Sequence, residues 1–168
     1  MKRIITLISI IAGTLLLDQL SKALVVGNMV YGELGSVPII PNFFHLTYIH
    51  NDGMAFGLAD NTVGRAIFMT VSTIAIIGLC IYLFRFCKEG MLLQTGVAFI
   101  ISGGIGNMID RIFRYNVIDM LDFRGIWGYI FNVADAFVCV GAGIVAVALI
   151  ISILKDKKKP KEDKNDNK

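Results

Sequence analysis

Charged residues are scarce in this sequence: they make up 17% of its 168 residues, whereas a soluble domain of this size carries about 25%. Proline is scarce as well, with three residues, while hydrophobic residues reach 55%. The mean hydropathy is +0.69. These shortages exclude an ordinary soluble domain and predict one integral membrane domain.

Cysteine and histidine are also rare. Cys80, Cys87 and Cys139 lie in or beside hydrophobic runs, so they are interpreted as small buried hydrophobic residues and not as a disulfide framework. His45 and His50 lie in a connecting segment and are interpreted as structural residues there. Neither a His-Glu-x-x-His pattern nor a paired-cysteine pattern occurs. We therefore expect no metal site and no cofactor.

Serine-nucleophile and phosphate-loop patterns are missing too. Ser72 and Ser102 lie in hydrophobic runs with no histidine at the same membrane level. The glycines of residues 103–106 lack a preceding strand and a following Lys-Ser/Thr pair, so they do not form a phosphate loop. We expect no nucleic-acid partner.

Four hydrophobic runs are each long enough to cross a bilayer, which takes about 20 helical residues. We predict an all-α membrane protein with four transmembrane helices, in which residues 1–154 form a single domain. The first run resembles a signal peptide because it follows Lys2 and Arg3. It continues past Asp18, however, which favours an uncleaved span. The predicted spans cover about residues 4–26, 66–86, 91–111 and 134–154.

The distribution of lysine and arginine predicts the orientation of these spans. The connection 27–64 contains neither residue, so it is placed outside the cell membrane. The connection 112–130 is also placed outside, although Arg114 and Arg124 weaken the rule there. Both termini are predicted to be cytoplasmic. The basic residues assigned to the cytoplasmic side are Lys2, Arg3, Arg85, Lys88 and the lysines of the tail.

The C-terminal tail, residues 155–168, is rich in lysine and has no hydrophobic residue. It cannot bury apolar surface, so we expect it to be a disordered cytoplasmic segment. Two roles remain open for it. Either it touches the anionic head groups of membrane lipids and holds the last span in place, or it is merely solvated.

The connection after the first span has a strand-like composition at residues 43–50, followed by the turn signal Asn51-Asp52-Gly53. A second extended piece, residues 54–57, comes next. We predict a small extracytoplasmic β platform at about residues 37–58, accompanied by a short extracytoplasmic helix or loop. The segment after Arg111 is expected to act as a lid.

Polar residues that are costly inside a bilayer recur at one depth. From the rise of an α-helix, Asp18 lies roughly 21 Å and Asn107 roughly 24 Å above the cytoplasmic edge. Asp119 follows Arg111 closely in the chain and can fold back to this level. The predicted outer polar layer contains Asp18, Lys22, Asn107, Arg111, Asp119 and Asp135.

A structural explanation accounts for part of this layer. Asp18 can pair with Lys22, which lies one turn later on the same helix face. Arg111 can pair with Asp110 or Asp135, and the amides can cap helix ends.

Asp119 and Asp135 are not both explained in this way, because the site has no spare cation. Two close carboxylates cannot both ionise cheaply, so such a pair holds one shared proton near neutral pH. One carboxylate can then take a proton from water while the other donates to a carbonyl oxygen. The pair thus permits peptide hydrolysis by general acid–base catalysis.

Five short blocks in this order resemble the lipoprotein signal peptidase family, also called signal peptidase II. Each block is weak alone, but their combined order and spacing are specific and cover nearly all of the chain except the tail. The blocks are Asp18-Gln19-x-x-Lys22, Asn51-Asp52-Gly53-Met54-Ala55-Phe56, Gly103-Gly104-Ile105-Gly106-Asn107-x-x-Asp110-Arg111, Val117-Ile118-Asp119-Met120 and Phe131-Asn132-Val133-Ala134-Asp135.

The resemblance implies an aspartic endopeptidase of the bacterial cytoplasmic (inner) membrane, acting near its outer face as a monomer. Its substrate would be a diacylglyceryl-modified prolipoprotein, cut just before the lipidated cysteine. Asp119 and Asp135 would be the catalytic dyad. Substrate would be held by Asn51, Gly53, Asn107, Arg111, Asn132 and Ala134, and the site would be supported by Asp18, Lys22 and Asp110.

Two other classes of function remain open from the residues alone. A small membrane transporter or proton-relay subunit also uses intramembrane carboxylates, but it predicts discontinuous helices or repeated halves, which the sequence does not show. A non-catalytic assembly factor would use the platform for binding.

Overall fold

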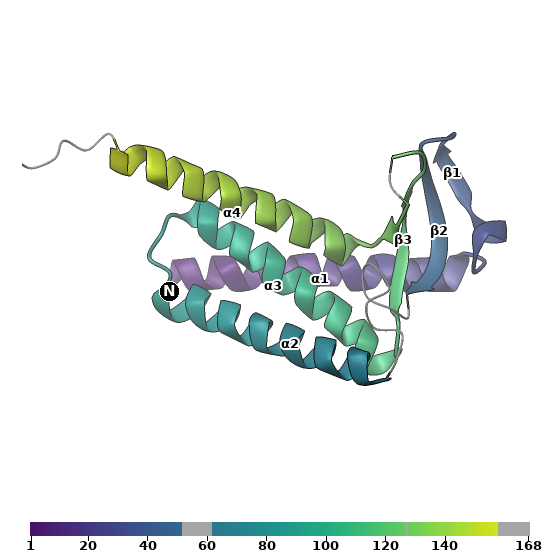
Figure 1. Cartoon of the computed structure of the whole chain (residues 1–168), viewed down its shortest axis with the longest axis horizontal. Coiled ribbons are helices and arrows are strands. Elements are labelled where there is room, and N and C mark those ends of the chain that lie inside the picture. Colours follow the sequence, from purple (N-terminus) through teal and green to yellow (C-terminus); the bar gives the residue numbers. More distant parts are fainter. Residues whose placement is uncertain (52–61, 127, 158–168) are drawn as a thin grey trace, which may run out of the picture.

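The computed structural model describes residues 1–51, 62–126 and 128–157. Four long helices form a bundle, and a small sheet stands across one end of it (Figure 1). The predicted four-helix membrane fold is confirmed. The helices are α1 (Lys2–Asn28), α2 (Thr62–Ile81, continued by the π-helical turn η3, Tyr82–Phe86), α3 (Met91–Phe113) and α4 (Val133–Lys157).

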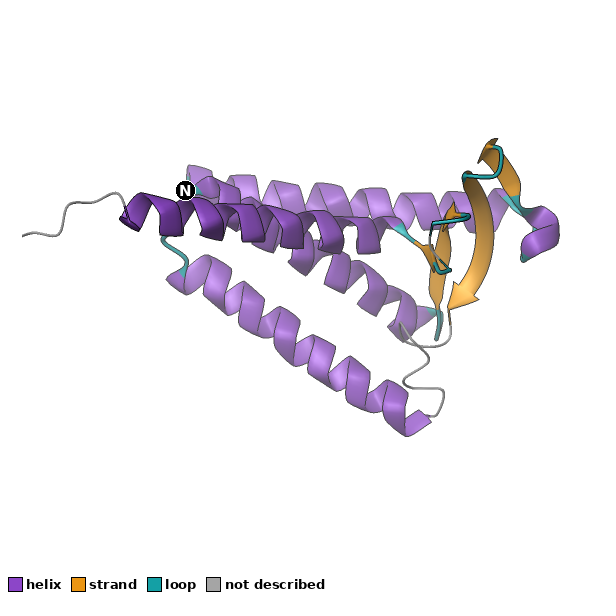
Figure 2. Cartoon of the chain, turned by 45° about the horizontal axis from the view of Figure 1, so that its top comes forward, coloured by secondary structure: helices purple, strands orange, loops and turns teal. Residues whose placement is uncertain are grey.

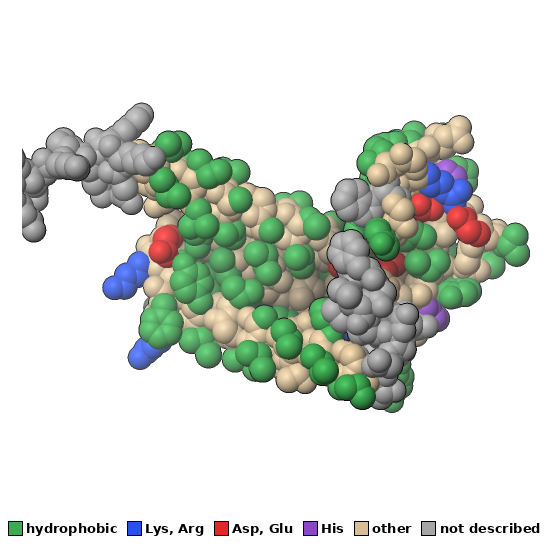
Figure 3. All heavy atoms as spheres, in the orientation of Figure 1, with side chains coloured by type: hydrophobic (Ala, Val, Ile, Leu, Met, Phe, Trp, Pro, Cys, Tyr) green, Lys and Arg blue, Asp and Glu red, His purple; other side chains and the backbone are tan. Residues whose placement is uncertain are grey.

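Each of the four helices is long and apolar enough to cross a membrane. Their outward surfaces are hydrophobic: Ile5, Ile74 and Ile150, for example, are each more than half exposed. Figure 3 shows hydrophobic side chains over the whole length of the bundle, with charged residues at its two ends. A surface of this kind is stable only against lipid, so the chain is a multi-pass membrane protein.

Helix α3 is the centre of the bundle and packs on each of the other three helices. Its close contact with α4 depends on glycine, because helices in membranes associate through small residues. A Cβ atom added to Gly96 would lie 2.8 Å from the carbonyl oxygen of Gly141, and one added to Gly141 would lie 2.6 Å from that of Gly96. The two backbones therefore lie too close together for a Cβ atom at either position, and only glycine fits there.

The end of the bundle far from the sheet is tied together by Arg3. Its guanidinium donates to the side chain of Gln94 at 2.7 Å and to the carbonyl oxygens of Leu83 and Cys87 at 2.8 and 2.9 Å. The start of α1 is thus fixed to the end of α2 and the start of α3. Arg3 also satisfies carbonyls that the π-helical turn leaves free.

The sheet is antiparallel, with strand order β1-β2-β3-β4, and it lies across the helix ends (Figure 2). Strand β2 confirms the strand predicted at residues 43–50, and the turn η1 (Glu33–Gly35) is a short helix beside the platform. The second extended piece, residues 54–57, lies outside the described residues. The strands are β1 (Val37–Ile40), β2 (Phe44–Asn51), β3 (Val117–Phe123) and β4 (Ile130–Phe131).

The segment after Arg111, which was expected to act as a lid, supplies β3, an inner strand of the sheet, and β4. A lid movement of this segment stays a prediction. Ile118 and Met120 of β3 are buried against Val25 of α1 and Tyr48 of β2. This strand was not predicted from the sequence, because two of its seven residues are aspartates and aspartate is depleted in strands. Burial on both faces of β3 holds the segment against the bundle.

The glycine contact predicts a matched pair of substitutions in α4. Gly141→Ala forces a methyl group against the carbonyl of Gly96 and should destabilise the protein by about 1–3 kcal/mol. Gly143→Ala meets nothing within 4 Å and should be neutral or stabilising, because alanine is the better helix former. Thermal unfolding in detergent measures both. Equal melting temperatures for the two variants would contradict this packing.

Candidate active site

The outer polar layer is built around the ammonium group of Lys22. Its Nζ lies 2.9 Å from Asp18 Oδ2 and 2.7 Å from Asp110 Oδ2, and it donates to Asn107 Oδ1 at 3.1 Å. The side chains of Lys22, Asp18 and Asp110 are at most 1% exposed. A charge buried this deeply is stable only when every hydrogen-bonding position is used. The predicted pairing of Asp18 with Lys22 is present.

Asp18 also fixes the start of α4. Its Oδ1 accepts the backbone N–H of Ala134 at 2.9 Å, at the positive end of the helix dipole. Its other oxygen faces Gly106, where an added Cβ would lie 2.5 Å away. One carboxylate from α1 therefore holds α3 and α4 at a set separation.

Asn132 and Asp135 form a reciprocal cap on α4. The backbone N–H of Asp135 donates to Asn132 Oδ1 at 2.9 Å, and the backbone N–H of Asn132 donates to Asp135 Oδ2 at 3.2 Å. This is a capping box with aspartate in place of glutamate. The cap fixes the direction of the Asp135 carboxyl.

Two asparagines connect the aspartates of α4 and β3. Asn107 Nδ2 donates to Asp135 Oδ1 at 2.8 Å. Asn132 Nδ2 donates to Asp119 Oδ1 at 2.6 Å and to Asn107 Oδ1 at 3.1 Å. Because Asn107 also accepts from Lys22, one continuous set of hydrogen bonds joins the buried ion pairs to both carboxyls.

Asp119 lies on β3 opposite Ile49 of β2, and its Oδ2 accepts Asn51 Nδ2 at 2.9 Å. Burial raises the pKa of Asp119 to about 6, and the negative charge of Asp135 acts in the same direction. The hydrogen bonds from Asn51 and Asn132 favour the ionised form and limit this rise. Asp119 can therefore gain and lose a proton close to neutral pH.

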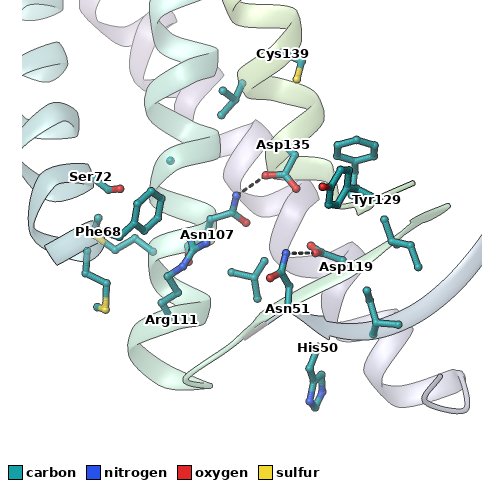
Figure 4. A pocket seen from close by; sticks show the side chains of 18 of the residues that line it. His50, Asn51, Phe68, Ser72, Asn107, Arg111, Asp119, Tyr129, Asp135 and Cys139 are labelled. Atoms are coloured by element: carbon teal, nitrogen blue, oxygen red, sulfur yellow. Dashed lines mark hydrogen bonds between the residues drawn. The ribbon is translucent and has the colours of Figure 1, made fainter. Parts of the chain in front are cut away.

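Both aspartates face a pocket of about 800 Å³ between the sheet and helices α2, α3 and α4 (Figure 4). At the sheet its wall combines the polar side chains of His50, Asn51 and Asp119 with apolar side chains of the same strands, and Asn107 of α3 lies beside them. Between the helices the wall is mostly apolar. The lining residues of that part are Phe68, Met69, Ser72, Gly104, Met108, Val138 and Cys139.

The predicted site residues fall into two groups. Asn51, Asn107, Arg111, Asp119 and Asp135 line the pocket. The buried group does not line it: Asn132 and Ala134 are both 0% exposed and serve the start of α4, so a substrate contact for them stays a prediction. Gly53 lies outside the described residues.

The expected pairing of Arg111 with Asp110 or Asp135 is wrong. Asp110 pairs with Lys22 and with Arg114, one turn further along α3. Arg111 instead donates to the carbonyl of Asn107 at 3.3 Å and lies over the ring of Phe68. The observed pair could have been predicted from the sequence, because Asp110 and Arg114 are four residues apart on one helix and such residues lie on the same face.

Gln19 and Phe68 were missed as site residues. Gln19 donates to Asp18 Oδ2 at 3.0 Å and accepts from Arg114 at 3.3 Å, so it completes the buried cluster. Gln19 belongs to a recognised block, but Phe68 lies in a plain hydrophobic run and gave no signal. Among the described residues, no group of three or more His, Cys, Asp or Glu side chains could hold a metal ion.

A model of the signal peptidase (SPase) II family matches residues 10–151. The lipoprotein signal peptidase of Fusobacterium nucleatum is 44% identical over 137 residues, 79% of this chain and 79% of the relative. That of Clostridioides difficile is 44% identical over 135 residues, 80% of this chain and 87% of the relative. A bacterial membrane enzyme structure determined in meso has a TM-score of 0.77 at 28% identity, covering 94% of this chain and 92% of its own.

The raised pKa of Asp119 predicts a pH-dependent cost to stability. Since folding raises this pKa from 3.8 to about 6, the cost is absent below about pH 4, grows as the pH rises through 6, and is then constant. Asp119→Asn removes the cost. Relative to wild type, the variant should therefore melt at a higher temperature at pH 7.5 than at pH 4, by an amount that corresponds to at most roughly 3 kcal/mol.

Comparing the two pH values cancels the effects of the substitution that do not depend on pH, including the loss of a hydrogen-bond acceptor. Melting curves of both proteins in one detergent, at several pH values, provide the measurement. A melting-temperature difference that stays constant from pH 4 to 7.5 would show that Asp119 titrates normally in the folded protein.

Proposed function

This chain belongs to the signal peptidase II family, and on that premise we propose that it is an aspartic endopeptidase that cuts prolipoproteins just before the diacylglyceryl-modified cysteine. Membership of the family makes it a peptidase that processes the signal peptides of prolipoproteins. The aspartic mechanism and the position of the cut are what we propose beyond family membership. Family membership disfavours the transporter and assembly-factor alternatives, and no feature of the described structure supports either of them.

The observation that carries the proposal is the placement of two carboxyls from different elements on one pocket. Asp135 comes from the first turn of α4 and Asp119 from an inner strand of the sheet. Amide donors hold both in position, and the pocket around the pair is lined by both polar and apolar side chains. A peptide with a lipid anchor needs a site of this mixed character.

The charges of the layer support a shared proton. Lys22 and Arg114 are used by Asp18 and Asp110. Among the side chains that the structure describes, one cation, Arg111, then remains near the pair at the pocket, and it can balance one negative charge there. One proton held between the two carboxyls balances the charges. The described cations and carboxylates of the layer are Lys22, Arg111 and Arg114, and Asp18, Asp110, Asp119 and Asp135.

Hydrolysis then requires no group beyond the pair and one water molecule. The ionised carboxylate takes a proton from water as its oxygen attacks the peptide carbonyl carbon. The protonated carboxyl donates its proton to the carbonyl oxygen, which gives a neutral tetrahedral diol. Collapse of the diol breaks the C–N bond: one diol hydroxyl returns its proton to the carboxylate that had donated one, and the proton taken from water passes to the leaving nitrogen. The pair ends the cycle with one proton, as it began.

The placement of the site also suggests the orientation in a bacterial inner membrane. The sheet and the pocket lie at one end of the bundle, and basic side chains gather at the other end (Figure 3). That end holds the start of α1, with Lys2 and Arg3, and the connection from α2 to α3, with Arg85 and Lys88 (Figure 1). We place the basic end in the cytoplasm and the site at the outer face. We also propose that the protein acts as a monomer.

Cleavage of a purified diacylglyceryl-prolipoprotein in detergent tests the mechanism. Asp119→Asn and Asp135→Asn should each lower kcat by at least about a hundredfold, because each removes one partner of the proton transfer. A shift in gel mobility on loss of the signal peptide measures the rate.

The matched control is Asp122→Asn. Asp122 lies on the same strand as Asp119 and is 7% exposed, but it bonds Thr47 and Arg124 on the platform. It should keep kcat within about threefold of wild type if the protein folds. Full activity in either dyad variant would remove that aspartate from the mechanism.

Cysteine labelling tests the orientation. In a chain whose three cysteines are replaced, Leu34→Cys should react with an impermeant maleimide added outside, since Leu34 is fully exposed beside the platform. Lys88→Cys, in the exposed turn between η3 and α3, should react after the inner face is opened. The reverse pattern would overturn the proposed orientation.

A further inference from the structure

The three cations of the outer polar layer have different partners. Lys22 lies between two buried carboxylates, and Arg114 pairs with one of them. Arg111 makes no ion pair within the described residues. Its one hydrogen bond there is to the carbonyl of Asn107. The other N–H groups of Arg111 have no hydrogen-bond partner among the residues that the structure describes.

A free guanidinium on a long side chain has many conformations, and ordering it costs up to about 2 kcal/mol. Arg111 is held in one of them by an aromatic ring. Its Cζ lies 5.0 Å from the centre of the Phe68 ring, within the range of a cation–π contact. Both side chains are partly buried and line the pocket together with Asp119 and Asp135 (Figure 4).

Phe68 is the residue by which helix α2 contacts the Arg111 guanidinium. Helix α2 packs mainly on α3, and the buried ion pairs draw no residue from it. The Phe68–Arg111 contact lies in the α2–α3 interface, where Thr73 also donates to Met108 Sδ at 3.5 Å. The position of α2 thus decides where the Arg111 guanidinium lies.

We propose that Phe68 is a positioning residue that holds Arg111 so that its guanidinium binds an acceptor oxygen of the substrate before the chemical step. This rests on the proposed function and extends it to α2. Lysine cannot replace Arg111 here, because an ammonium group lacks both the flat face that stacks on the ring and the fork of donors. Among the described residues, Arg111 forms neither a hydrogen bond nor an ion pair with the carboxyl of Asp119 or Asp135, so we expect Phe68 to act mainly on substrate binding.

A double-mutant cycle tests this inference. Phe68→Leu should raise KM about tenfold, the loss expected for a partly desolvated cation–π contact, and leave kcat within about twofold. In the Arg111→Gln background, Phe68→Leu should change KM by less than about twofold, because the cation is already gone. Phe68→Tyr keeps the ring and should stay close to wild type.

The matched control is Phe99→Leu. Phe99 stacks on Phe137 between α3 and α4, with ring centres 5.3 Å apart, and does not line the pocket. Phe99→Leu removes an aromatic ring from the bundle without changing the contact of Arg111. The KM of this variant should therefore equal that of wild type. A KM for Phe99→Leu as high as that of Phe68→Leu would mean that any ring loss loosens the site, and would overturn the proposal.

Three further results would overturn it: additive losses in the cycle, a Phe68→Tyr variant as impaired as Phe68→Leu, or a fall in kcat with KM unchanged. If Phe68→Leu does not fold, Phe68→Met takes its place in the cycle, and the same results support or overturn the proposal.

Binding of a fluorescent diacylglyceryl peptide to the same variants separates the two proposals. If wild type binds the peptide with the predicted cycle but does not cleave it, the proposed peptidase mechanism fails while the role of Phe68 stands. If wild type cleaves but the binding losses are additive, Phe68 has no positioning role and the peptidase stands.

Discussion

The fully buried ion pairs of Lys22 are the constraint on which the rest of the structure depends. An uncompensated charge at this depth would cost several kcal/mol, so Asp18 on α1 and Asp110 on α3 must stay in contact with it. Asp18 in turn holds the first turn of α4 through Ala134. Three helices are therefore fixed to one another at the level of the site, and Asp135 is placed as a result.

The polar residues of the site are ordered from the inside outward. Lys22 orients Asn107, Asn107 orients Asp135 and Asn132, and Asn132 orients Asp119. Each amide uses its carbonyl oxygen toward a donor and its NH₂ group toward an acceptor, so none can flip without loss. Groups that do not themselves touch a substrate can in this way set the geometry of those that do.

The sequence predicted the helices and the depth of the layer because both follow from composition and helical rise. Asp18 and Lys22 were paired correctly from their spacing alone. The partner of Arg111 could not be predicted from spacing, because Arg114 on the same helix pairs with Asp110 instead. Strand β3 was not predicted, because it contains two aspartates, a residue that is depleted in strands. Phe68 could not be found, since an aromatic residue in a hydrophobic run looks the same whether it faces lipid or a guanidinium.

The two aspartates belong to different layers of the molecule: Asp119 to the sheet and Asp135 to the bundle. The packing between these layers therefore sets the separation of the two carboxyls, and Asn132 is the side chain that bridges it. A substitution in the buried contact between β3 and α1, at Met120 or Val25, would alter that separation without touching either acid.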